Sequence, residues 1–304
     1  MRHLISVADV SEKEIKELIK LAKKLKEDRL KGVTTDYLKN KSLAMIFELP
    51  STRTRVSFEV AMTELGGHAL YLNWNDLQLG RGEPIKDTAR VLSRYVHAVM
   101  LRVRDHRVIE EFAHYSTVPV INGLSNLEHP CQVLSDLMTI YEHKGELENL
   151  MITWVGDGNN VCNSLILASA LAKMKMVVST PEKYSPNPEI VKKAIEIGGK
   201  IIFERDPRRA VVDADVVYTD VWISMGQERE RDERLKAFNK YQVNSELLKF
   251  AKKDVIVMHC MPAHRGEEIT DEIIESKYSV VFDQAENRLH MQKAILLKLI
   301  GEKL

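Results

Sequence analysis

The sequence predicts an α/β protein of two domains, each a parallel sheet flanked by helices. Its 304 residues, 44% of them hydrophobic, are enough for two cores. Short apolar runs alternate with amphipathic segments, which is typical of parallel sheets. Lys144-Gly145-Glu146 interrupts this alternation. We therefore expect domains at 1–145 and 146–285, with a C-terminal helix in 286–304 that packs back on the first domain.

The first domain is expected to open with an amphipathic helix. Ser11 to Glu14 has the pattern of a capping box, and apolar residues then recur at helical spacing from Ile15 to Leu25. The strands expected next are Leu43–Leu49, Ala69–Leu72, His97–Val103 and Val118–Ile121. The helices expected between and after them are Thr54–Leu65, Pro84–Tyr95, His106–Tyr115 and Pro130–His143.

The second domain repeats the pattern of buried strands. They are expected at Met151–Val155, Met176–Ser179, Lys200–Phe203, Val216–Thr219 and Val255–Met258. The polar segment Gly226–Glu233 is expected to be a flexible loop. The final helix, from about Ala285 to Leu299, is apolar on one face.

Composition excludes several classes of function. Lysine plus arginine (44) equals aspartate plus glutamate (44), so the chain lacks the basic surplus of nucleic-acid-binding or membrane-surface proteins. Three scattered cysteines favour a reducing compartment, and we expect a cytoplasmic protein. No apolar run reaches the roughly 18 residues that a membrane span needs.

Unusual polar residues gather where the expected strands end. Ligands of open α/β sheets bind beyond the carboxyl ends of the strands, so these positions are candidate sites. They are Ser51-Thr52-Arg53-Thr54-Arg55, Arg102, His129-Pro130-Cys131-Gln132, Asn159-Asn160, Asp220 and His259-Cys260.

Ser51–Arg55 has the chemistry of a phosphate site. Hydroxyls and two arginines stand at the start of a helix, where free N–H groups and the helix dipole favour an anion. A guanidinium donates two parallel hydrogen bonds to phosphate oxygens. The alternative is that Ser51 or Thr52 only caps the helix while the arginines point to solvent.

Two other motifs leave alternatives open. Gly156-Asp157-Gly158 after a strand suggests a dinucleotide site, but the third glycine of that fingerprint is missing. Cys260 is a buried inert cysteine, a metal ligand with His259 and His264, or an active-site thiol. The metal alternative lacks a clear fourth ligand.

Five motifs together resemble one family. Ser51–Arg55, followed by Val56-Ser57-Phe58-Glu59, resembles the carbamoyl-phosphate motif of the aspartate and ornithine carbamoyltransferase family, and His129–Gln132 resembles its second motif. Three stretches are similar to the ornithine branch: Gly156-Asp157-Gly158-Asn159-Asn160, Asp220-Val221-Trp222-Ile223-Ser224-Met225-Gly226 and His259-Cys260-Met261-Pro262. The resemblance extends to Arg288 and covers essentially the whole chain. It departs at Met261, where the family usually has leucine, a volume-conserving change.

The resemblance implies transfer of a carbamoyl group from carbamoyl phosphate to the side-chain amine of L-ornithine, giving L-citrulline and phosphate. It implies a carbamoyl-phosphate site of Ser51, Thr52, Arg53, Thr54, Gln78, Arg102, His129, Pro130, Cys131, Gln132, Cys260, Met261 and Arg288. It implies an ornithine site of Asn160, Asp220, Ser224 and Met225. The catalytic residues implied are Arg102, His129, Asp220 and Cys260.

The implied roles agree with the chemistry of the reaction. Attack on the carbamoyl carbon places negative charge on its oxygen, which Arg102 and His129 would stabilise as an oxyanion hole. The attacking amine must first lose a proton, because its usual pKa is near 10. Departing phosphate can accept the proton released later, so neither a metal nor an organic cofactor is expected.

The resemblance also implies an assembly. Gln78, in the loop Asn75–Arg81, is expected to contact the site of a neighbouring subunit in a homotrimer or a multiple of trimers. The rival functions are carbamoyl transfer to aspartate or putrescine, a nicotinamide-dependent oxidoreductase and a non-catalytic anion-binding module.

Overall fold

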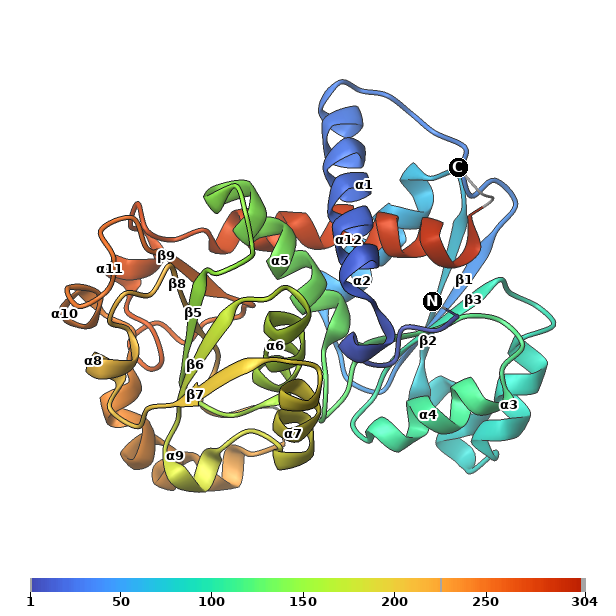
Figure 1. The fold of residues 1–304 in the computed structure, drawn as a ribbon. Helices are drawn as coiled ribbons and strands as arrows, with labels where there is room; N and C mark the ends of the chain where they lie inside the picture. The colour runs from blue at the N-terminus through green and yellow to red at the C-terminus, as the bar shows by residue number, and fades with distance from the viewer. Residues whose placement is uncertain (1, 225, 302–304) are drawn as a thin grey trace. The chain divides into compact units, whose positions relative to one another are not determined.

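The computed structural model describes residues 2–224 and 226–301 (Figure 1). Its strands are β1 (Ser42–Phe47), β2 (His68–Asn73), β3 (Ala98–Arg102), β4 (Val120–Leu124), β5 (Met151–Val155), β6 (Lys175–Ser179), β7 (Lys200–Phe203), β8 (Val216–Thr219) and β9 (Ile256–His259).

The α-helices are α1 (Glu12–Leu30), α2 (Thr52–Glu64), α3 (Ile85–Leu92), α4 (His106–Tyr115), α5 (Pro130–Lys144), α6 (Asn160–Leu171), α7 (Pro188–Glu196), α8 (Pro207–Ala210), α9 (Arg231–Phe238), α10 (Ser245–Leu248), α11 (Asp271–Ile274) and α12 (Val281–Ile300). Short 3-10 helices are η1 (Val7–Asp9), η2 (Trp74–Asp76), η3 (Gln78–Arg81), η4 (Glu182–Tyr184), η5 (Glu228–Glu230) and η6 (Asn239–Tyr241). The chain divides into two compact units, Met1–Met138 with Glu286–Leu304, and Thr139–Ala285.

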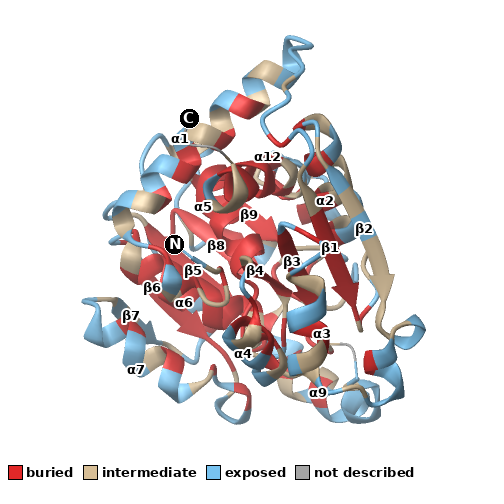
Figure 2. Ribbon diagram, turned by 90° about the vertical axis from the view of Figure 1, so that its right-hand side faces the viewer, coloured by how far each residue is buried: buried red, intermediate tan, exposed pale blue. Residues whose placement is uncertain are grey.

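The first unit is built on a parallel sheet with strand order β2-β1-β3-β4. Side chains alternate across a strand, so Ala44 and Ile46 of β1 pack in a core with Ile109 and Phe112 of α4. In Figure 1, α3 and α4 lie on one side of this sheet and α1, α2 and α12 on the other. The central strand β1 is buried and the edge strand β2 is partly exposed (Figure 2).

Helix α12 packs on the first unit through charged side chains that cross to other helices. Lys26 of α1 donates to Asn287 (2.9 Å), Lys298 pairs with Glu17 of α1 (3.0 Å), and Lys293 pairs with Glu64 of α2. Lys293 is buried, so its ammonium depends on this carboxylate partner. The expectation of a C-terminal helix returning to the first domain is therefore confirmed.

The second unit is built on a five-stranded parallel sheet with order β7-β6-β5-β8-β9. One face of the sheet packs in a core with Phe238 of α9, Leu247 of α10 and Ile273 of α11. The helix α6 is buried on nearly all sides. Trp154 and Tyr218, from neighbouring strands, stack with ring centroids 5.1 Å apart.

The predicted elements are found with shifted ends. The capping box of α1 forms as expected, since Ser11 accepts the N–H of Glu14 and the Glu14 carboxylate accepts the N–H of Ser11. The last strand ends at His259 and α12 begins at Val281, four residues before the expected start. The expected loop Gly226–Glu233 contains η5 and the first turn of α9. Its helix was missed because the segment carries no apolar periodicity.

Candidate active site

Most of the predicted polar residues lie at the switch point of each sheet. The residues that flank the switch points are those after β1 and β3 in the first unit and after β5 and β8 in the second, whereas His129 and Cys260 follow the edge strands β4 and β9. In the first unit the chain proceeds from β1 outward to β2 and then returns to β3 on the other side. In the second unit the corresponding switch lies between β5 and β8. Adjacent connections leave in opposite directions at such a point and open a crevice beyond the carboxyl ends of the strands. Each unit therefore carries its own group of candidate residues.

In the first unit, two buried arginines converge on one hydroxyl. Thr54 Oγ1 accepts hydrogen bonds from Arg288 Nη2 (2.8 Å) and Arg102 Nη1 (3.4 Å). Ser51 caps α2 by accepting the N–H of Thr54 at 3.2 Å. Ser51 therefore caps the helix, and Arg55 is exposed and pairs with Glu59 at 3.1 Å, as the alternative expected. The burial of Arg102 and Arg288 still concentrates positive charge beside this helix N-terminus. An anion is the ligand that such a site favours.

His129 lies close to the same arginines, after β4 and directly before α5. Burial, followed by the charges of Arg288 and Arg102, holds the pKa of His129 well below its usual range. The imidazole is therefore neutral near pH 7 and offers one N–H donor and one acceptor. A neutral donor of this kind can stabilise a developing oxyanion without exchanging its own proton.

Gln132, in the first turn of α5, has one engaged and one open amide atom. Its Nε2 donates to Asp136 Oδ1 at 2.9 Å, while its buried Oε1 has no hydrogen-bond partner within the described residues. A buried acceptor without a donor is costly, so an N–H of a ligand would stabilise this amide. The neighbouring Cys131 donates its thiol to the carbonyl of Asn122 (3.4 Å), and burial raises the pKa of that thiol to about 12.

Gln78 stands apart from this group. It begins η3, its side chain is exposed, and no described interaction links it to Thr54, Arg102 or His129. The following Leu79 is buried and anchors the turn. An exposed position on an anchored turn is compatible with the predicted contact to another subunit.

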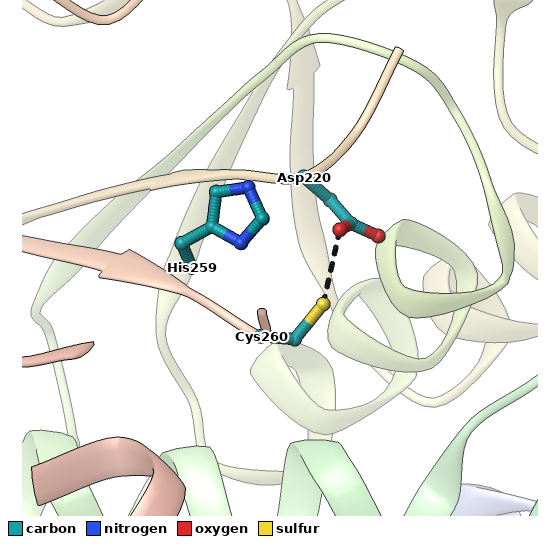
Figure 3. A group of neighbouring side chains, drawn as sticks. All are labelled: Asp220, His259 and Cys260. Atoms are coloured by element: carbon teal, nitrogen blue, oxygen red, sulfur yellow. Dashed lines mark hydrogen bonds between the residues drawn. The ribbon is translucent and has the colours of Figure 1, made fainter. Parts of the chain in front are cut away.

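In the second unit, Asp220 is a buried carboxylate held by neutral donors (Figure 3). Cys260 Sγ donates to its Oδ1 at 3.0 Å and Asn159 Nδ2 to its Oδ2 at 2.7 Å. Within the described residues Asp220 makes no ion pair, although only 6% of it is exposed. A buried charge without a counter-charge is expensive, so a cationic ligand would stabilise this arrangement.

His259 is fixed beneath this carboxylate by its own two contacts. Its Nδ1 accepts the N–H of Met261 (2.9 Å), so Nε2 carries the proton and donates to the fully buried Glu268 at 3.0 Å. Asp220, His259 and Cys260 each have one potential metal-ligand atom in this group, and these three atoms lie within 4.8 Å of one another. Because both ring nitrogens of His259 are engaged, we assign no metal to this group.

The two glycines after β5 serve the packing of the turn. Gly156 has φ +136°, and a side chain on Gly158 would meet the backbone of Pro186 and Ser185 at 2.3 and 2.5 Å. These demands explain the partial dinucleotide fingerprint without a nucleotide. Asn160 begins α6 directly after Asn159, whose side chain contacts Asp220.

The segment after β8 is held by a buried arginine. Arg234 of α9 contacts Asp157 at 3.2 Å and donates to the carbonyl of Trp222 at 2.9 Å. Ser224 follows two residues later, and its N–H donates to the side chain of Gln227 (2.9 Å). Met225, predicted to hold ornithine, lies outside the described residues.

Comparisons with known proteins match both units. The carbamoyl-phosphate-binding domain model of aspartate/ornithine carbamoyltransferases matches residues 2–142, and the aspartate/ornithine-binding domain model matches 148–299. This chain belongs to the aspartate/ornithine carbamoyltransferase family. A relative named ornithine carbamoyltransferase from Archaeoglobus fulgidus is 75% identical over 100% of this chain and 99% of its own. The one from Methanosarcina mazei is 57% identical over 98% and 99%.

Solved structures in the family share the fold of the whole chain. Ornithine carbamoyltransferase from Pyrococcus furiosus has a TM-score of 0.96 at 55% identity, covering 100% of this chain and 98% of that one. The enzyme of that name from Thermus thermophilus has a TM-score of 0.90 at 43% identity, covering 99% of each. The predicted family and fold class are therefore confirmed. In the part of the chain that the structure describes, no helix is both long and apolar enough to cross a membrane.

The family motifs contain the predicted site residues. They do not contain every residue whose side chain contacts and positions those site residues. Thr54, Arg102, His129 and Arg288 form one group of the first unit, and Asn159, Asp220 and Cys260 form one group of the second. Sequence reasoning missed the roles of Asn159, Arg234 and Glu268. Only Asn159 carried a signal, because asparagine before an apolar helix is a common N-cap.

Proposed function

We propose that this chain is an ornithine carbamoyltransferase, which converts carbamoyl phosphate and L-ornithine into L-citrulline and phosphate. The observation that supports it best is Asp220, a buried carboxylate that has only neutral donors and therefore favours a cationic amine. The family assignment and the relatives' names favour the same substrate. Residues 1–145 would bind carbamoyl phosphate and 146–285 ornithine.

Carbamoyl phosphate would bind where Ser51, Thr52, Arg53 and Thr54 start α2, with Arg102 and Arg288 beside Thr54. The phosphate would accept hydrogen bonds from free N–H groups of the helix and from the guanidiniums. Gln132 Oε1 would accept an N–H of the carbamoyl group, the donor that this buried oxygen lacks among the described residues. Pro130, Cys131 and Met261 would contribute mainly backbone and apolar contacts.

Ornithine would bind in the second unit, where polar side chains and one carboxylate are available for its charged groups. Asn160, Asp220, Ser224 and Met225 would hold the α-amino acid end. Asp220 would accept a hydrogen bond from an ammonium, with Cys260 beside it. An amine without the α-carboxylate would lose the contacts made by the α-amino acid end of ornithine, so it should be a much poorer substrate.

Chemistry would then proceed at the carbamoyl carbon. The side-chain ammonium first releases one proton to solvent, and the neutral amine then attacks the carbon and forms the new C–N bond while the C–O bond to phosphate breaks. Arg102 and the neutral His129 donate hydrogen bonds to the carbamoyl oxygen as its negative charge grows. The attacking nitrogen gives up its second proton, which the departing phosphate can accept. No step of this reaction calls for a metal or an organic cofactor.

Assembly and compartment follow from the same proposal. We place Gln78 at the site of a neighbouring subunit in a homotrimer or a multiple of trimers, because its side chain is exposed on an anchored turn. Cys131, Cys162 and Cys260 are all free thiols, which favours the reducing cytoplasm.

A substrate panel tests the function. We expect kcat/KM for L-ornithine to exceed that for lysine, putrescine or aspartate by at least about 10²-fold when citrulline or its analogues are measured. Comparable kcat/KM for putrescine would show that the α-amino acid end is not recognised. A preference for aspartate would assign the chain to the aspartate branch of its family.

A further inference from the structure

Asn159 uses both ends of its amide group. Its Oδ1 accepts the backbone N–H groups of Val161 (3.0 Å) and Cys162 (3.1 Å) and so caps α6. Two donors at Oδ1 fix the orientation of the amide, because the NH₂ group could not accept them. The NH₂ group therefore points to Asp220, where it donates to Oδ2 at 2.7 Å.

The second bond to Asp220 comes from a different strand end. Cys260 follows β9 and donates to Oδ1, while Asn159 follows β5 and donates to Oδ2. The carboxylate is therefore held at both oxygens and cannot rotate without breaking one of two partly buried hydrogen bonds. Each oxygen retains a further lone pair, so Asp220 can still accept from a ligand in the directions left open.

We propose that Asn159 is a positioning residue for carbamoyl transfer, which holds Asp220 so that its open lone pairs face the side-chain ammonium of ornithine. The inference rests on the proposed function and deepens it. Asn159 itself acts through Asp220, not on the reacting atoms.

The surroundings of Asp220 make this donor important. The titratable groups that act on or near it are Asp157 before the turn, Cys162 on α6, and His259 and Cys260 after β9. Of these, Asp157 repels the charge of Asp220 when it is ionised, and Asp157 itself pairs with the Arg234 guanidinium at 3.2 Å. The neutral Asn159 amide thus supplies stabilisation that a second anion at the same place would reverse.

Two variants separate positioning from helix capping. Asn159→Asp keeps a strong N-cap but exchanges the donor that faces Asp220 for a second carboxylate oxygen. Asn159→Ser also keeps a cap, but its short hydroxyl no longer supports Asp220. The matched control is Asn187→Asp, because Asn187 caps α7 in the same way, accepting from Glu189 N at 2.9 Å and Ile190 N at 3.4 Å.

Steady-state kinetics against pH gives the readout. In Asn159→Asp, the pH below which kcat/KM for ornithine falls should lie about one pH unit or more higher than in the wild type, since two adjacent carboxylates resist full ionisation. Asn159→Ser should lower kcat/KM for ornithine on the order of tenfold without moving that limb. KM for carbamoyl phosphate should stay within about twofold of wild type in both variants, and Asn187→Asp should match wild type throughout.

Each outcome is decisive. A wild-type pH profile for folded Asn159→Asp, or equal losses toward both substrates in Asn159→Ser, would overturn the positioning role while leaving the proposed function intact. If Asn159→Asp fails to fold, the substrate split of Asn159→Ser decides alone. Absence of citrulline formation by the wild type would overturn the proposed function and the positioning role together.

Discussion

Arg234 offers the sharpest test of how the second unit is held together. Its guanidinium contacts Asp157 at 3.2 Å, and the two side chains are 6% and 8% exposed. It also donates to the carbonyl of Trp222 and lies 4.7 Å from the ring centre of Tyr184. Replacement by methionine preserves much of the apolar stem and removes the charge, so Asp157 is left buried without its cation.

The expected cost follows from that burial. Removing one partner of a buried ion pair costs about 3–5 kcal/mol, because the remaining charge is uncompensated. The second carboxylate partner, Glu230, is 54% exposed and should add little. We therefore expect Arg234→Met to lower the free energy of unfolding by about 3–5 kcal/mol at pH 8.

The loss should depend on pH in a defined direction. Burial raises the pKa of Asp157 to about 6, with the Arg234 charge opposing that rise. A carboxyl whose folded pKa is raised costs stability as pH rises through that pKa, and removal of Arg234 raises it further. Arg234→Met should therefore be destabilised less at pH 5, where Asp157 binds a proton, than at pH 8.

Urea unfolding at one protein concentration measures both effects, with the fluorescence of Trp154 and Trp222 as the signal. Asp157→Asn, alone and combined with Arg234→Met, completes a double-mutant cycle. The double variant should recover at least half of the loss. A loss below about 1 kcal/mol at pH 8, or an equal loss at pH 5, would show that this pair does not hold the unit as argued.

Three further outcomes are expected. Arg53→Ala should lose about 10²-fold in turnover with the fold intact, and unchanged carbamoyl phosphate binding by calorimetry would contradict the phosphate site. Gln132→Met should raise KM for carbamoyl phosphate by about tenfold and leave ornithine binding unchanged, whereas a loss confined to ornithine would contradict the role of Oε1. Arg102→Ala and Gln78→Ala should each be slow, and refolding them together should restore roughly a quarter of the sites in a cyclic trimer. No gain over the average of the parents would place Gln78 outside a shared site.

The sequence predicted those parts of the site that depend on residues close together in the chain. Ser51 and Thr54 could be placed because a strand, a hydroxyl cap and a helix follow one another within a few residues. His259 was found for the same reason, but its partner Glu268 was not. Glu267 and Glu268 stand side by side in a polar stretch, and only the fold makes one of them fully buried.

Long-range pairings account for the rest of what was missed. Asn159 and Asp220 are 61 residues apart and meet only because β5 and β8 are neighbours in the sheet. Arg234 lay beyond a polar segment expected to be loop, since a helix that buries an arginine has no apolar stripe to reveal it. Such pairs depend on strand order, which local periodicity does not determine.

The convergence of Arg102 and Arg288 on Thr54 has a consequence for how the protein is made. Thr54 and Arg288 are 234 positions apart, so a ribosome must add 234 residues after Thr54 before the second guanidinium exists. A nascent chain that has emerged only as far as Gly145 also lacks Lys293, the buried partner of Glu64. The anion site is thus finished last, although most of its residues are synthesised first. A gene fragment encoding the first 145 residues should accordingly yield a product that binds carbamoyl phosphate poorly, until a peptide spanning α12 is supplied in trans.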